Sequence, residues 1–186
     1  MREALDHWLP DGSVRTRHAR RAAASADELW SAARTIRLTD TRRLGRLVRW
    51  RIPDVPAAET YHELFRTYPF TVLDESPSGL ISGLCGKIWT VARDYPRLSG
   101  AADFSSWNEP GTVRVAFAHW VTPREEGAEI VSEARVEPID TAARLRLKAV
   151  WAVVGPFERL VGAEPLSLAV ARAELQAPSS SAAAPE

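Results

Sequence analysis

The stretch from Gly111 to Pro156 constrains the fold most strongly, because three of its runs alternate between two sets of side chains. The first run places five residues on one face: Val113, Val115, Phe117, His119 and Val121. The second and third runs do the same with Ile130, Ser132, Ala134 and Val136, and with Leu145, Leu147, Ala149, Trp151 and Val153. Turn-like segments at 123–127 and 137–141 separate the runs. A period of two over this length predicts an antiparallel meander with one buried face.

The segments before the meander predict a strand, two short helices and a hairpin. Residues 13–24 alternate as a first strand does, and Ser25 with Glu28 forms a capping box that begins a helix. Thr39-Asp40 begins a second helix that runs to Arg51. Runs at 70–75 and 80–89, joined across Ser76-Pro77-Ser78-Gly79, predict a β-hairpin.

A helical pattern follows Pro156, and Pro165 is expected to kink this helix or to start a new first turn. The fold class is therefore predicted as α+β. A curved antiparallel sheet of about seven strands wraps around a long C-terminal helix, with two short helices after the first strand. We expect a polar leader at 1–12, a single domain at 13–176 and a disordered, low-complexity tail at 177–186.

Four segments of the chain form a recognisable set: Ser25-Ala-Asp-Glu-Leu-Trp30, Gly83-Leu-Cys-Gly-Lys-Ile-Trp89, Ser132-Glu-Ala-Arg-Val136 and the expected closing strand 143–155 with the helix after it. Together they resemble the START-like and polyketide-cyclase-like superfamily, also called SRPBCC. The resemblance covers about residues 13–176, and Pro165 departs from the uninterrupted closing helix of that family. It implies the helix-grip fold, with a cavity for lipids, polyketides, sterols or other apolar molecules. Members include carriers, cyclases, hydratases and protein-interaction modules, so the resemblance implies no single activity.

Composition narrows the function classes further. The chain has 24 Lys and Arg against 24 Asp and Glu, so it has no net positive charge that would attract nucleic acid. The single cysteine, Cys85, permits no internal disulfide, and the four histidines have no metal-ligand spacing. No metal and no cofactor are therefore expected. The first residues do not form a signal peptide, and no run approaches the roughly 20 apolar residues of a membrane span. We expect a cytoplasmic protein without stable membrane insertion.

Three residues are the candidates for chemistry. His119 falls on the inward face of the first run, where it serves either as a general acid or base or as a hydrogen-bonded core histidine. Glu133 and Arg135 share one face of the second run. That pair forms an outward ion-pair ladder in one register and lines the cavity in the other, and alternation does not choose between them.

The expected partner is a small hydrophobic molecule of lipid, polyketide or aromatic type. The residues expected to bind it are Trp89, Phe117, His119, Trp120, Glu133, Arg135 and Trp151. The sequence supports a carrier or sensor, with a cyclase or dehydratase acting in the same cavity as an alternative. A third hypothesis is a protein-interaction module that docks through the Arg-rich helix at 41–51.

Overall fold

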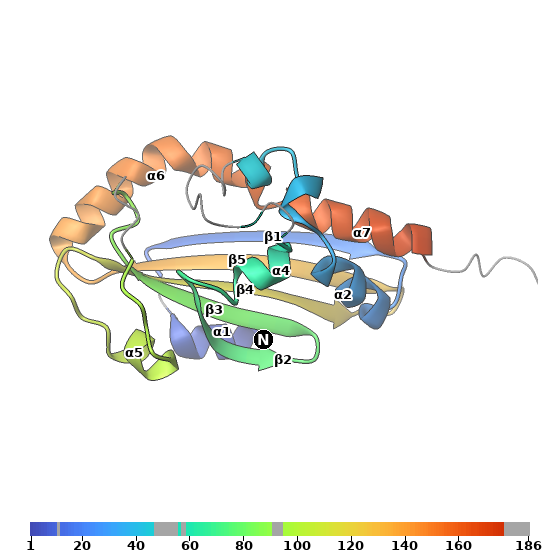
Figure 1. Cartoon of the computed structure of the whole chain (residues 1–186), viewed down its shortest axis with the longest axis horizontal. Helices are drawn as coiled ribbons and strands as arrows, with labels where there is room; N and C mark the ends of the chain where they lie inside the picture. The colour runs from blue at the N-terminus through green and yellow to red at the C-terminus, as the bar shows by residue number, and fades with distance from the viewer. Residues whose placement is uncertain (11, 47–55, 57–58, 91–94, 177–186) are drawn as a thin grey trace, which may run out of the picture.

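An antiparallel sheet of five strands forms the middle layer of the molecule, in the order β1-β5-β4-β3-β2 (Figure 1). The strands are β1 (Val14–Ala22), β2 (Thr71–Ser76), β3 (Gly79–Gly86), β4 (Val113–Pro123) and β5 (Ala128–Pro138). This computed structural model describes residues 1–186 except 11, 47–55, 57–58, 91–94 and 177–186. Within the last turns of helix α6, the side chains of 153–154 and 156–161 also lie outside the description.

Helices cover both faces of the sheet. The upper face, as seen in Figure 1, carries α2 (Ala26–Arg34), α4 (Tyr61–Leu64), α6 (Thr141–Val161) and α7 (Glu164–Gln176). The lower face carries α1 (Arg2–Trp8) and α5 (Ala101–Ser106), and the short 3-10 helix η1 (Leu38–Asp40) follows α2 in the chain. The predicted α+β class is confirmed. The described sheet has five strands instead of about seven.

The elements at the start of the chain form as the local sequence predicts. Ser25 Oγ accepts a hydrogen bond from Glu28 N (3.3 Å), and Ser25 N donates to the Glu28 carboxylate (2.8 Å), so the capping box begins α2. The predicted hairpin is confirmed as β2 and β3, with an irregular register between Val72 and Asp74. Of the second helix expected from Thr39 to Arg51, Thr39 and Asp40 instead belong to η1, residues 42–43 form a bend, and residues 47–51 lie outside the described residues.

The third alternating run is helix α6, so its prediction as a strand was wrong. Ala143 and Leu147 are buried at a spacing of four, whereas Leu145 is 63% exposed. Asp140 caps the helix by accepting a hydrogen bond from Ala143 N (2.7 Å). Leu, Arg, Lys and Ala favour a helix, and these propensities with the cap outweigh the alternation.

The end of the chain forms two helices instead of one. Pro165 lies in the first turn of α7, where a missing N–H costs nothing. Glu164 fixes this corner, because its carboxylate accepts hydrogen bonds from the backbone N–H groups of Arg42 (2.7 Å), Arg43 (3.1 Å) and Leu44 (3.0 Å). The resulting break separates α6, over one end of the upper face, from α7, which packs on α2 and β1.

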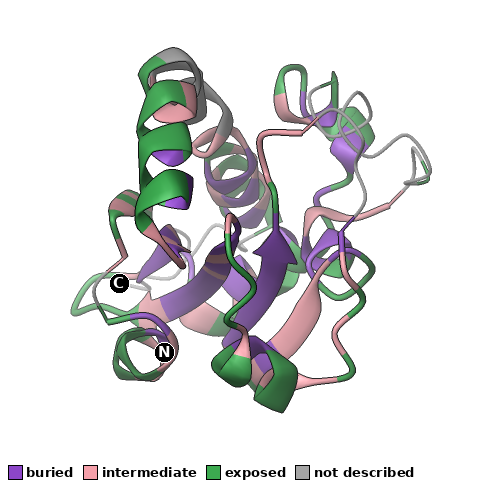
Figure 2. Ribbon diagram, turned by 90° about the vertical axis from the view of Figure 1, so that its left-hand side faces the viewer, coloured by how far each residue is buried: buried purple, intermediate pink, exposed green. Residues whose placement is uncertain are grey.

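The first residues are part of the packed structure and not only a polar leader. Helix α1 lies on the lower face with Leu5 and Leu9 completely buried, in one cluster with Phe104, Ala116 and other lower-face residues. Figure 2 shows how the buried residues concentrate on the strands and on the sheet-facing sides of the helices. The tail at 177–186 lies outside the described residues.

The turn between β4 and β5 requires glycine at position 127. Gly127 has a φ of 81°, and a Cβ there would lie 2.0 Å from the carbonyl oxygen of Ala22. We expect Gly127→Ala to lower the free energy of unfolding by about 1–3 kcal/mol, measured by urea denaturation. Gly100→Ala is the matched control, because its added Cβ meets nothing within 4 Å. Equal stabilities of the two variants would contradict this account of the turn.

Candidate functional site

A half-buried patch lies at the middle of the upper face, where complete burial is the normal expectation for a sheet beneath helices. On β4, Phe117 is partly exposed although Val115 and Val121 on the same face are buried. On β5, Ser132 and Ala134 are partly exposed between the buried Ile130 and Val136. We call this region, with its half-buried neighbours, the upper-face patch: Thr16, His18, Tyr61, Phe117, Ser132 and Ala134.

The strand register arranges the patch in two rows that cross the sheet. One row contains Ser82, Phe117, Ala134 and Thr16, and the next contains Leu80, His119, Ser132 and His18. The charged residues of β4 and β5 occupy the alternate positions of these strands, whose side chains point to the lower face: Arg114, Glu129, Glu133, Arg135 and Glu137. The first row is apolar apart from hydroxyl groups, and the second carries hydroxyl and imidazole groups.

Two adjacent side chains of helix α4, Tyr61 and His62, form hydrogen bonds with residues of the second row. Thr60 caps this short helix through a hydrogen bond that its Oγ1 accepts from Glu63 N (3.1 Å). Tyr61 then places its hydroxyl 3.3 Å from Ser132 Oγ, and His62 places Nδ1 3.0 Å from His119 Nε2. The helix is therefore joined to β4 and β5 through four polar side chains.

The histidine pair is buried among aromatic rings. Trp30 lies 5.5 Å from the ring centre of His62 and 5.6 Å from that of His119, and Phe65 contacts His119 from the α4 side. Burial lowers the pKa of His62, and burial together with the charge of His62 lowers the pKa of His119 to about 3. Both rings are consequently neutral at physiological pH, and the pair shares one N–H···N hydrogen bond.

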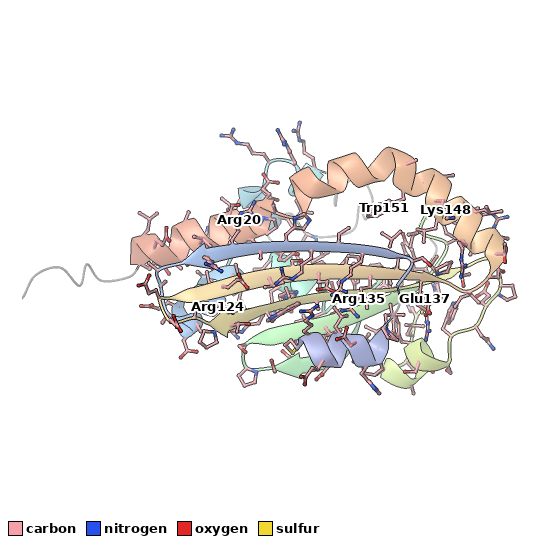
Figure 3. All side chains as sticks on the ribbon, turned by 180° about the vertical axis from the view of Figure 1, so that it is seen from behind. Arg20, Arg124, Arg135, Glu137, Lys148 and Trp151 are labelled. Carbon is pink, nitrogen blue, oxygen red and sulfur yellow. The ribbon has the colours of Figure 1, made fainter. Side chains whose placement is uncertain are left out.

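Glu133 and Arg135 lie on the lower face, on the opposite side of the sheet from His119. Arg135 is fully buried. It lies between the sheet and α1 (Figure 3), and its Nε donates to Glu133 Oε1 (2.8 Å). Its Nη1 donates to the Leu9 carbonyl (2.7 Å), and its Nη2 forms an ion pair with Asp6 at 2.6 Å. Arg15 completes the cluster, with Nε 2.7 Å from Glu133 Oε1. The register thus separates this pair from His119, and the three candidates for chemistry do not gather at one site.

The remaining residues expected to bind a ligand are scattered. Trp120 is buried on the lower face in the cluster beneath α1, away from the upper-face patch. Trp89 packs partly buried near Val113 and Val115, beyond one end of the patch. Trp151 is half-buried on α6, beside Gly155 (Figure 3). Of the seven predicted binding residues, Phe117 belongs to the patch and His119 lies immediately beside it.

Sequence reasoning did not select the residues that surround these two. Tyr61 and His62 come from α4, Trp30 from α2, and His18 and Ser132 from the two strands beside β4. The available signal was local: Thr60 is a good helix cap directly before an aromatic and a histidine. The pairing of His62 with His119 spans 57 positions along the chain, and nothing in the spacing of the histidines indicates it.

The described part of the chain contains neither a cluster of metal-binding side chains nor a membrane-spanning helix. No three His, Cys, Asp or Glu side chains within it gather closely enough to hold a metal ion. No helix in the same part combines the length and the apolar character needed to cross a membrane.

Comparisons with known proteins give similarities in solved structures only, since neither a family model nor a curated protein matches the sequence. The di-domain aromatase/cyclase StfQ from the steffimycin biosynthetic pathway is 12% identical, with a TM-score of 0.37 over 88% of this chain and 52% of StfQ. The chain thus spans about half the length of StfQ.

A Thermus thermophilus protein is 10% identical, with a TM-score of 0.33 over 89% of this chain and 100% of its own. The Zhui aromatase/cyclase from Streptomyces is 13% identical, with a TM-score of 0.31 over 91% of this chain and 99% of its own. We draw no functional inference from similarities of this size.

Proposed function

We propose that the chain binds a small apolar molecule on its upper-face patch and acts as a carrier or sensor. The observation that carries this proposal is the partial exposure of Phe117 on β4 and of Ser132 and Ala134 on β5, although the residues toward both ends of this face are buried. A ligand that covers partly exposed apolar side chains removes their surface from water. This stabilises the complex by about 25 cal/mol for each Å² of apolar surface buried.

The composition of the patch suits an apolar ligand. Phe117 and Ala134 provide the apolar floor, and Phe65 and Phe70 stand beside Phe117 with ring centres 5.2 and 5.4 Å away. Aromatic rings at these separations offer flat surfaces for stacking. The charges of β4 and β5 point to the lower face, so they do not oppose transfer of an apolar molecule into the patch.

The arrangement favours binding over catalysis. A cyclase or dehydratase acting through His119, Glu133 or Arg135 needs at least one of these groups free to contact the substrate. His119 is buried and hydrogen-bonded to His62 (3.0 Å). Glu133 and Arg135 instead pair with each other, with Asp6 and with Arg15 under α1. The expected protein-interaction helix at 41–51 contributes backbone N–H groups to Glu164 at its start, and its second half lies outside the described residues.

A substitution that fills the patch tests the proposal. We expect Ala134→Leu to weaken binding of the uncharged dye Nile red at least about tenfold, because the larger side chain occupies the space of the ligand. The free energy of unfolding is expected to change by less than about 1 kcal/mol, because Ala134 is only half-buried. Fluorescence titration measures the affinity, and urea denaturation measures the stability.

Ala102→Leu is the matched control, since Ala102 is exposed on α5 at the lower face. It is expected to bind Nile red as the unsubstituted chain does. Dye binding that is absent in the unsubstituted chain, or that is equal in the two variants, would overturn the proposal.

A further inference from the structure

We propose that the ligand of the upper-face patch is an uncharged molecule whose apolar body carries a hydroxyl or carbonyl group, and that Ser132 and Tyr61 bind this polar group. The inference deepens the proposed function and rests on it.

Charge is distributed unevenly between the two faces of the sheet. Side chains alternate between the faces, and in β4 and β5 every charged residue falls on the lower face. On β1, Arg15 and Arg17 also point downward, and they make ion pairs with Glu133 at 2.7 and 3.9 Å. On the upper face β1 carries Arg20, two positions beyond His18, and its Nε donates to Ser167 Oγ on α7 (3.3 Å). An ionised carboxylate or phosphate placed over Phe117 and Ala134 would leave water without meeting a counter-ion from β4 or β5, which is unfavourable.

The imidazoles of His62 and His119 lie behind the patch, and their protonation decides whether they can attract an anion. His62 and His119 form a buried pair at 3.0 Å, and each has a lowered pKa because of burial. At neutral pH this pair supplies no positive charge to an anionic ligand. On the sheet-facing side of α6 the buried residues are Ala143 and Leu147, which are also uncharged.

Two hydroxyl groups, of Ser132 and Tyr61, lie at one end of the patch. Ser132 is half-buried beside Ala134 on β5, and its Oγ lies 3.3 Å from the Tyr61 hydroxyl, a long hydrogen bond. A serine hydroxyl has one donor and two acceptor positions, so Tyr61 does not exhaust it. A ligand hydroxyl or carbonyl placed there exchanges its hydrogen bond with water for one with the protein, while its apolar body lies over Phe117 and Ala134.

Three naphthalene derivatives of similar size test the inference by displacement of Nile red at neutral pH. We expect 2-naphthol to bind about two- to tenfold more tightly than naphthalene, which is the range for one additional hydrogen bond. The anion 2-naphthoate is expected to bind at least about tenfold more weakly than 2-naphthol. In Ser132→Ala, the advantage of 2-naphthol over naphthalene is expected to fall below about twofold, with the affinity for naphthalene unchanged.

Ser105→Ala is the control, because Ser105 is an exposed serine on α5 at the lower face. It should leave the affinities for all three molecules as they are. Equal binding of 2-naphthol and naphthalene, tighter binding of 2-naphthoate, or an equal loss for both neutral molecules in Ser132→Ala would overturn the inference and leave the proposed function intact. Failure of Nile red and naphthalene to bind at all would overturn the proposed function itself.

Discussion

Arg135→Met is expected to lower the free energy of unfolding by about 3–5 kcal/mol, the usual cost of removing one partner of a buried ion pair. Arg135 is 0% exposed, and its guanidinium joins the carboxylates of Glu133 and Asp6 with the carbonyl of Leu9. Burial acts against its charge, but the carboxylates of Glu133 and Asp6 outweigh this effect and raise the pKa of the guanidinium. Without Arg135, the carboxylate of Glu133 stays buried with less compensation.

Urea denaturation measures this loss, and Arg21→Met is the matched control. Arg21 lies on β1 with 81% of its side chain exposed, 3.6 Å from the Glu129 carboxylate, so its removal should cost less than about 1 kcal/mol. The double variant Glu133→Gln, Arg135→Met should be more stable than Arg135→Met alone, because the unpaired carboxylate is gone. Equal losses in Arg135→Met and Arg21→Met would show that the buried cluster does not stabilise the fold.

The same variant should loosen α1. Two of the contacts of Arg135, to Asp6 and to the Leu9 carbonyl, hold this helix and the residue after it against the lower face. Hydrogen exchange in the backbone of 5–9 should therefore accelerate in Arg135→Met more than exchange in β4. Unchanged relative protection would indicate that Leu5 and Leu9 hold the helix by apolar packing alone.

Acidification from pH 7 to pH 5 is expected to lower the free energy of unfolding by about 2 kcal/mol through His119 alone. In the unfolded chain an ordinary histidine gains a proton near pH 6.5, whereas burial keeps His119 neutral until about pH 3. Between these values the unfolded state binds more protons, so each pH unit below 6.5 costs about 1.4 kcal/mol. His62 has a lowered pKa as well, so it contributes in the same direction.

Urea denaturation at pH 7, 6 and 5 measures this dependence. Carboxylates with lowered pKa values, such as Glu129 and Asp140, lose their contribution mainly below pH 5, so the window from 5 to 6.5 reports on histidine. His119→Gln should flatten the profile by the amount that His119 contributes. Ser105→Ala, at an exposed position of α5, removes no titratable group and should leave the slope unchanged. A profile that stays equally steep in His119→Gln would refute the assignment.

Local sequence signals were sufficient for most elements of the fold. Alternation identified β4 and β5 as strands and gave the inward face of β4, but it left the inward face of β5 open. The capping box at Ser25 identified the start of α2. The same signal failed at 143–155, because a helix with Leu145 and Trp151 exposed or half-exposed also shows apolar residues at every second position. There the decisive information was the Asp140 cap and the helical spacing of Ala143 and Leu147.

The sequence by itself determined the α+β class and the face on which Phe117 and His119 lie, because periodicity is a local property of the chain. Only the tertiary structure decided that Ser132 shares this face and that Glu133 and Arg135 lie opposite, under α1. That outcome depends on the register between strands and on a helix packed from the other end of the chain. The pairing of His62 with His119, and of Tyr61 with Ser132, likewise needs α4 to dock on the sheet. Contacts between residues 57 and 71 positions apart leave no periodic trace, and for this reason the candidate site emerged only from the folded chain.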